Sequence, residues 1–329
     1  MGLVPTPLDL ARTQVPVPPP ESKGLRAARS SRGPESPRWG STILFLAPAA
    51  VLLIVFLLYP AIYTILLSFN RGRNGLIGEW VGLDNYVRLF GDGDFLNLAW
   101  PPSGALWNNF LWMVFYTSIV IFLGLLIAVI ASRVRYEAII KAIIFIPMAI
   151  AATALAVIWK FVYSPDSNIG VLNAILGNFG VAPIAWLGDE NLVNGALIAV
   201  GIWGSVGFAT IILSAAVKSI PSEVIESARV EGASERQVFF RIMLPMVSLP
   251  ASVLAVTLIV NVIKLFDLIY VMTFGGPGKA SRLIAFTMYQ QAFSAGQYGY
   301  GSAVAVVMLI LLIPLIYFNV RRFRTKAVV

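Results

Sequence analysis

The sequence predicts an all-α membrane protein with six transmembrane helices and with both the N- and the C-terminus cytoplasmic. Its 329 residues are 58% hydrophobic and only 12% charged, and their mean hydropathy is +0.82. A typical soluble chain has a charged fraction of about 25%. Lipid is therefore the expected solvent for most of this chain.

Six apolar stretches define the predicted spans. A hydrocarbon core about 30 Å thick requires roughly 20 apolar residues of helix. The stretches that meet this length are 43–69, 107–131, 142–163, 194–217, 247–270 and 301–320. A seventh uncharged stretch, 167–188, is rich in Asn and Gly. This composition favours an external loop with an interfacial helix over another span.

The positive charges give the expected orientation. With six spans and an internal N-terminus, seventeen of the 24 Lys and Arg fall in the N-terminal tail, 132–141, 218–245 and 321–329. Only five fall in the external segments, as the positive-inside rule requires. A seventh span would place the basic C-terminus outside, so six spans fit better.

Two regions of different composition divide the chain. Residues 1–40 are rich in proline and lack apolar periodicity, which predicts a disordered cytoplasmic tail. Residues 41–329 form the predicted transmembrane domain, with a polar loop at 218–245. The basic residues flank apolar runs and form no continuous patch, so we expect no nucleic-acid partner.

The composition excludes several kinds of chemistry. The chain has no His and no Cys, so we expect no catalytic residues and no metal site. It also lacks a Walker A loop, because its only Gly-Lys pair, Gly278-Lys279, is followed by Ala280. A membrane-embedded enzyme is therefore disfavoured. An ion-coupled secondary transporter remains an alternative, although the inverted repeats typical of that class are not visible.

The loop at 218–245 reads as two short helices with a break between them. Ser222 can cap the first helix, and Glu226 lies early in it, where acids suit the helix dipole. Gly232 supplies the turn. Ser234 and Gln237 have the spacing of a capping box that starts the second helix.

Small side chains in this loop predict a thin surface that can insert into a groove on a partner. They are Ser227, Ala228, Gly232 and Ala233. The alternative is an ordinary amphipathic loop that lies on the membrane.

The spacing within the loop resembles the Glu-Ala-Ala signature of permease subunits in bacterial ATP-binding-cassette (ABC) importers. The matching residues, which would couple the chain to an ATPase, are Glu226, Ser227, Ala228, Gly232, Ile242, Leu244 and Pro245. Ser227 replaces an alanine, a change between small residues. The segment 266–277, with Gly-Gly-Pro at its end, is similar to the maltose-type branch, and the resemblance covers about 43–320.

This resemblance implies a permease subunit in a bacterial cell membrane that works by alternating access. The helix at 226–232 would dock on a cytoplasmic ABC ATPase dimer, which uses the ATP, and this chain would bind no cofactor. A second homologous permease and an extracytoplasmic solute-binding protein would complete the importer. The expected substrate is a carbohydrate, such as an α-glucoside di- or oligosaccharide. Glycerol-3-phosphate or another small solute is the alternative.

Polar residues in the fifth predicted span are candidates for the substrate pathway. Asn261, Lys264 and Asp267 are spaced i, i+3, i+6, which places them along one broad helix face. A structural ion pair between Lys264 and Asp267 is the alternative reading. Tyr270 and Trp203 offer aromatic faces for a sugar ring, although aromatic residues at span ends also serve as interfacial anchors. Other chemically suitable side chains are those of Trp159, Tyr163, Ser205 and Phe266.

Overall fold

The computed structural model describes residues 39–73, 75–97 and 104–326. The chain divides into two compact units, Met1–Ile54 and Val55–Val329. The predicted tail at 1–40 lies outside the described residues, except for its last two. In the first unit, the described residues form α1 (Trp39–Leu53), an apolar helix with Pro48 inside it.

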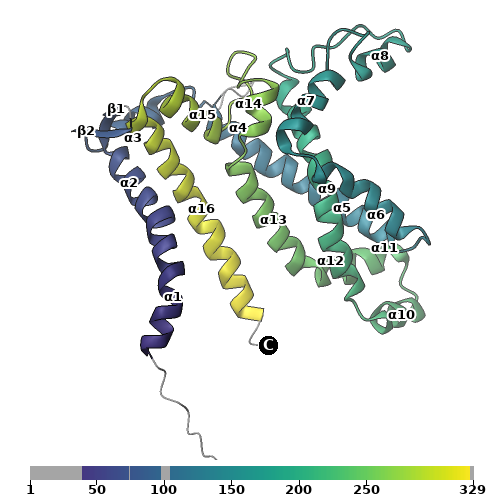
Figure 1. The fold of residues 1–329 in the computed structure, drawn as a ribbon. Helices are drawn as coiled ribbons and strands as arrows, with labels where there is room; N and C mark the ends of the chain where they lie inside the picture. Colours follow the sequence, from purple (N-terminus) through teal and green to yellow (C-terminus); the bar gives the residue numbers. More distant parts are fainter. Residues whose placement is uncertain (1–38, 74, 98–103, 327–329) are drawn as a thin grey trace, which may run out of the picture. The chain divides into compact units, whose positions relative to one another are not determined.

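The second unit is predominantly helical, with one small β-hairpin formed by β1 (Asn70–Arg73) and β2 (Leu76–Trp80). Its helices are α2 (Tyr59–Ser68), α3 (Asp84–Gly91), α4 (Ala105–Leu111), α5 (Thr117–Ala131), α6 (Glu137–Phe145), α7 (Ala152–Val162), α8 (Val171–Gly177), α9 (Val193–Lys218), α10 (Ser222–Val230), α11 (Glu235–Gln237), α12 (Leu244–Met246), α13 (Ser248–Ile263), α14 (Asp267–Met272), α15 (Ile284–Tyr289) and α16 (Tyr298–Lys326). Within this unit, α10–α12 lie at one end, and the hairpin, α3, α8, α14 and α15 lie at the opposite end (Figure 1).

Four helical stretches of the described residues are long and apolar enough to cross a membrane. They are Ile43–Ser68, Ala105–Ala131, Val193–Lys218 and Tyr298–Arg321. Two bent helix pairs raise the number of candidate spans to six if each pair counts as one. The short α8 lies within the seventh apolar stretch, so the prediction of a loop with a short helix there is confirmed.

The predicted span at 142–163 is a broken helix. α6 and the 3₁₀ turn after it meet α7 at an angle of 98°. The turn contains Pro147, and the chain is extended at Ile150 and Ala151. Proline removes a backbone donor and clashes with the preceding turn, which accounts for the end of α6 at Phe145, just before Pro147.

The predicted fifth span at 247–270 is wrong in its extent. α13 ends at Ile263, and a separate helix, α14, begins at Asp267 after a short non-helical connection. At its other end, α13 is bent by 64° from the preceding helical segment Glu235–Met246. Asn261, Lys264 and Asp267 therefore do not share one helix face.

Buried asparagines stabilise the break after α13. Asn109 donates its side-chain amide to the Val262 carbonyl (3.2 Å) and accepts from the Ile284 amide (2.7 Å). Asn108 donates to the carbonyls of Ala280 (2.8 Å) and Arg282 (2.9 Å). A buried polar group without a partner is costly, so these amides make the interrupted backbone tolerable inside the bundle.

The core of the second unit lies where α5 and α9 pack together. A Cβ on Gly124 would lie 2.6 Å from the Ala209 Cβ, so the two helices can approach this closely only with glycine at that position. Buried Val120, Leu197 and Leu213 belong to the same apolar cluster. This tight pair forms the rigid support for the features described below.

Candidate functional site

The polar loop after α9 has the two-helix form that its sequence predicts. α10 ends at Val230, and Gly232 has a φ of +85°. The Ala233 amide donates to the Ala228 carbonyl (2.9 Å), and the Gly232 amide donates to the Arg229 carbonyl (3.0 Å). These are the two bonds of a Schellman motif, which satisfies the last carbonyls of a helix. The turn at Gly232 is thus confirmed.

The two predicted helix caps have different outcomes. The capping box is confirmed, because the Ser234 amide donates to Gln237 Oε1 (2.8 Å) and Ser234 Oγ accepts from the Gln237 amide (3.4 Å). The predicted cap at Ser222 is wrong. Pro221 occupies the N-cap position with extended backbone angles, and Ser222 is the first helical residue. Proline fixes φ near the value of this position, so the helix begins one residue earlier than expected for a serine cap.

The residues of the Glu-Ala-Ala signature lie on two sides of this loop. Glu226, Ser227 and Gly232 are exposed. Ala228 is only 9% exposed and packs into the apolar core, so its predicted place on a protruding surface is wrong. Ala228 and Ala233 flank the Schellman turn, where an apolar contact commonly accompanies the motif.

The rest of the signature continues into α12. Ile242 is partly buried against the core, whereas Leu244 and Pro245 are exposed. The exposed end of α10 also carries Val230, which is 89% exposed. The sequence analysis missed this residue, although an apolar side chain just before a glycine turn was a usable signal. The loop thus presents an acidic and apolar tip from a core-anchored base.

Salt bridges hold the orientation of the loop. Glu235 accepts from Arg133, which lies between α5 and α6 (2.7 Å), and from Arg229 of α10 (2.8 Å). Both pairs are about half exposed, and such pairs contribute only about 0–1 kcal/mol. Their geometric effect is to connect both helices of the loop to the end of α5.

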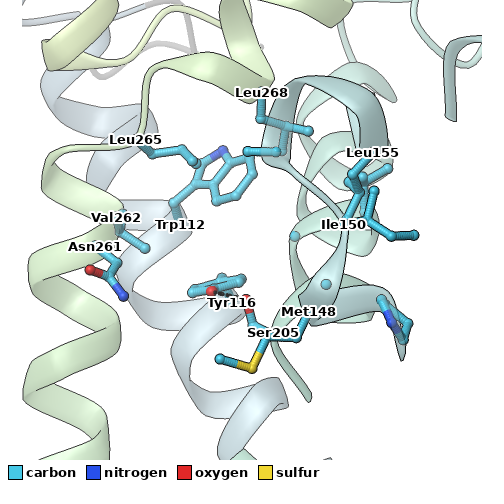
Figure 2. A pocket seen from close by; sticks show the side chains of 15 residues that line it. Trp112, Tyr116, Met148, Ile150, Leu155, Ser205, Asn261, Val262, Leu265 and Leu268 are labelled. Carbon is cyan, nitrogen blue, oxygen red and sulfur yellow. Dashed lines mark hydrogen bonds between the residues drawn. The ribbon is translucent and has the colours of Figure 1, made fainter. Parts of the chain in front are cut away.

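A cavity of about 180 Å³ lies where α7, α9, α13 and the π-helical segment Trp112–Tyr116 meet (Figure 2). The Tyr116 hydroxyl donates to Ser205 Oγ (2.7 Å). The indole N–H of Trp112 is buried and has no hydrogen-bond partner among the described residues. The cavity wall thus combines aromatic faces with a few polar groups, as is typical of small-molecule sites.

Close packing shapes this cavity. A Cβ on Gly201 would lie 3.2 Å from ring carbons of both Trp112 and Tyr116. The glycine on α9 therefore makes room for the two rings. Trp112 and Tyr116 were missed in the sequence analysis, because their contact with α9 depends on a helix pairing that spacing alone does not define.

The structure brings some of the predicted pathway residues together and separates others. Asn261 and Ser205 line the cavity. Lys264 and Asp267 are exposed and do not line it, and no ion pair joins them among the described residues. The alternative of an ion pair between them is therefore wrong, because the break after α13 ends the helical spacing.

The two aromatic candidates also lie outside the cavity lining. Trp203 makes an edge-to-face contact with Trp159, with ring centroids 5.6 Å apart. Tyr270 stacks on Phe266, with centroids 5.1 Å apart, within an aromatic cluster of α14 and α15. Neither arrangement tests a role in transport, so that role remains a prediction.

Comparison with known proteins identifies the relatives of this chain. Residues 120–326 match the family described as the binding-protein-dependent transport system inner membrane component. The chain is 43% identical over 287 residues to the osmoprotective compounds uptake permease protein GgtC of Synechocystis, covering 86% of this chain and 99% of the relative. It is 38% identical over 305 residues to the alpha-glucoside transport system permease protein AglF of Rhizobium meliloti, covering 91% and 84%.

More distant relatives agree. The trehalose/maltose transport system permease protein MalF of Thermococcus litoralis is 30% identical over 286 residues, covering 85% of this chain and 93% of the relative. Among solved structures, a bacterial ABC transporter involved in the import of alginate matches with a TM-score of 0.72 at 24% identity, covering 86% of this chain and 96% of that chain. This match concerns the fold.

Proposed function

The chain belongs to the family of inner membrane components of binding-protein-dependent transport systems, and on this premise we propose that its solute is a carbohydrate of the α-glucoside type. It is a permease subunit of an ABC importer in the cell membrane.

The cavity beside Trp112 is the observation that carries the proposal. A sugar ring has apolar faces that pack on aromatic rings and hydroxyls that exchange hydrogen bonds. Trp112 and Tyr116 contribute aromatic rings to the wall, and Tyr116, Ser205 and Asn261 offer polar groups around the same space. The names of relatives that import alpha-glucosides and trehalose or maltose support the same substrate class.

The loop at 218–245 is proposed to couple this chain to a cytoplasmic ATPase dimer. Its exposed tip at Glu226, Ser227 and Val230 is the part that would enter a groove on the partner. Both termini would then be cytoplasmic. A solute-binding protein would dock from outside the cell, and a second permease would pack against this chain within the membrane. The excess of positive charge in the loops on one side supports this orientation.

The test is uptake by the reconstituted importer of radiolabelled maltose, trehalose, sucrose and glycerol-3-phosphate. We expect at least one glucoside to be imported and to stimulate ATP hydrolysis. Asn261→Ala should lower its maximal uptake rate about fivefold, the effect of one lost hydrogen bond. Asn319→Ala, a change on α16 outside this cavity, serves as the control. Import of glycerol-3-phosphate alone would refute the assignment.

A further inference from the structure

A second and larger cavity lies farther along α7, toward the end of the bundle that carries α8. Its volume is about 590 Å³. The wall is formed by the last turns of α7, the loop after α8, and α14. Residues in it that can contact a polar ligand with an apolar face are Lys160, Phe161, Tyr163, Ser164 and Trp186.

This outer cavity follows the inner one along the same two helices. Ala152 and Leu155 of α7 line the inner cavity, and Val157 to Ser164 contribute to the outer one. On α14, Leu268 faces the inner cavity and Met272 the outer one. At 1.5 Å per residue, the centres of the two α7 segments are about 10 Å apart.

A row of four aromatic rings, here called the aromatic ladder, runs from α9 to the outer cavity. Its members are Trp203, Trp159, Tyr163 and Trp186. The centroid distances along it are 5.6, 5.2 and 5.9 Å. Tyr163 and Trp186 line the outer cavity, whereas Trp203 and Trp159 line neither cavity. Aromatic rings spaced in this way give a sugar successive apolar faces.

Three tryptophan side chains near the two cavities have N–H groups without hydrogen-bond partners among the described residues. They are the buried indole N–H groups of Trp112, Trp159 and Trp186. Buried donors without partners are rare in native proteins and call for an explanation. By contrast, the Tyr163 hydroxyl, also in the ladder, donates to the Ala196 carbonyl (3.0 Å). Of the three, Trp112 lines the inner cavity and Trp186 the outer one, whereas Trp159 lines neither.

We infer that the outer cavity is a second carbohydrate subsite, which holds the sugar before it reaches the inner cavity. The inference rests on the proposed function, since it takes the same substrate class. In this subsite the Trp186 ring packs on a sugar face and its N–H donates to a hydroxyl. Lys160 and Ser164 supply further polar contacts at the wall of the cavity.

The natural absence of cysteine allows a direct test. Three single variants are compared in the reconstituted importer: Ser164→Cys in the outer cavity, Ser205→Cys in the inner cavity, and Ile175→Cys on the exposed face of α8. Labelling of each by a small thiol reagent is measured with the solute-binding protein empty or loaded with maltose or maltotriose. The empty protein and Ile175→Cys control for shielding by docking.

We expect the loaded binding protein to slow labelling of both cavity cysteines at least fivefold and to leave Ile175→Cys unchanged. If Ser205→Cys is protected and Ser164→Cys is not, the outer subsite is refuted while the proposed function stands. If neither is protected, both fail.

A second measurement tests the indole donor itself. Trp186→Phe retains an aromatic ring and removes the N–H. The maximal uptake rate of maltotriose should fall about fivefold. Trp107→Phe is the matched control, because Trp107 stacks on Phe110 (5.4 Å) and lines neither cavity. Equal uptake by the two variants would overturn the role of Trp186.

Discussion

Replacement of Gly232 by valine tests whether the conformation of the loop couples this chain to ATP hydrolysis. Gly232 has a φ of +85°, and a Cβ placed there would meet no atom within 4 Å. The cost of a side chain is therefore backbone strain and not a clash. A left-handed conformation costs an L-residue roughly 1–2 kcal/mol, and strained sites cost up to about 3 kcal/mol. For a β-branched valine we expect a strain energy at the upper end of this range, about 2–3 kcal/mol.

This cost acts on the Schellman turn, because the bonds from Ala233 and Gly232 close only when φ is positive. A strain of about 2–3 kcal/mol shifts the equilibrium of the turn toward its open form by a factor of roughly 30–150. The transmembrane core is unaffected, so Gly232→Val should insert and assemble normally. ATP hydrolysis by the reconstituted importer, stimulated by the loaded binding protein, should fall by a similar factor.

A graded series separates conformation from side-chain size. Asparagine tolerates the left-handed region better than alanine or valine does, so stimulated ATP hydrolysis should decrease in the order Gly, Asn, Ala, Val. Co-purification of the ATPase should follow the same order. If Gly232→Val hydrolyses ATP at the wild-type rate, or if Gly232→Asn is as defective as Gly232→Val, the reasoning is refuted.

Three further predictions concern the cavity, the break after α13 and the topology. Gly201→Ala pushes a methyl group against the two aromatic rings of the inner cavity and should lower maximal uptake severalfold with normal assembly; wild-type uptake would mean that the cavity is not used. Since no ion pair joins them, the effects of Lys264→Ala and Asp267→Ala on uptake should add in the double variant within about 0.5 kcal/mol; a strong departure would reveal coupling. An impermeant thiol reagent applied from outside should label Ile175→Cys and not Glu231→Cys, and the reverse result would refute the orientation.

Local sequence signals predicted the parts of this fold that local interactions determine. The turn at Gly232 and the capping box of Ser234 and Gln237 depend on residues within a few positions of one another, so their spacing was sufficient. The long apolar helices were equally predictable from length and hydropathy.

The errors arose where distant contacts decide the structure. The residue that stabilises the break after α13 is Asn109, which is 153 residues away from Val262 in sequence. No residue pattern within 247–270 therefore predicts the break. Ala228 was placed on the surface because it is small, whereas its size is what lets α10 pack on the core. Trp112 and Tyr116 became site residues only through Gly201 on another helix.

The buried amide of Asn109 has a mechanical consequence. It hydrogen-bonds to both the end of α13 and the start of α15. Inside an apolar bundle, water does not replace a broken hydrogen bond. Asn109 therefore holds the end of α13 and the start of α15 in a fixed relative position. The bend at Val247, between α12 and α13, is spanned by backbone bonds from Val247 to Met243 and from Ala251 to Val247. We therefore expect movement imposed on the polar loop to bend the chain at Val247, while Asn109 keeps the far end of α13 joined to α4 and α15.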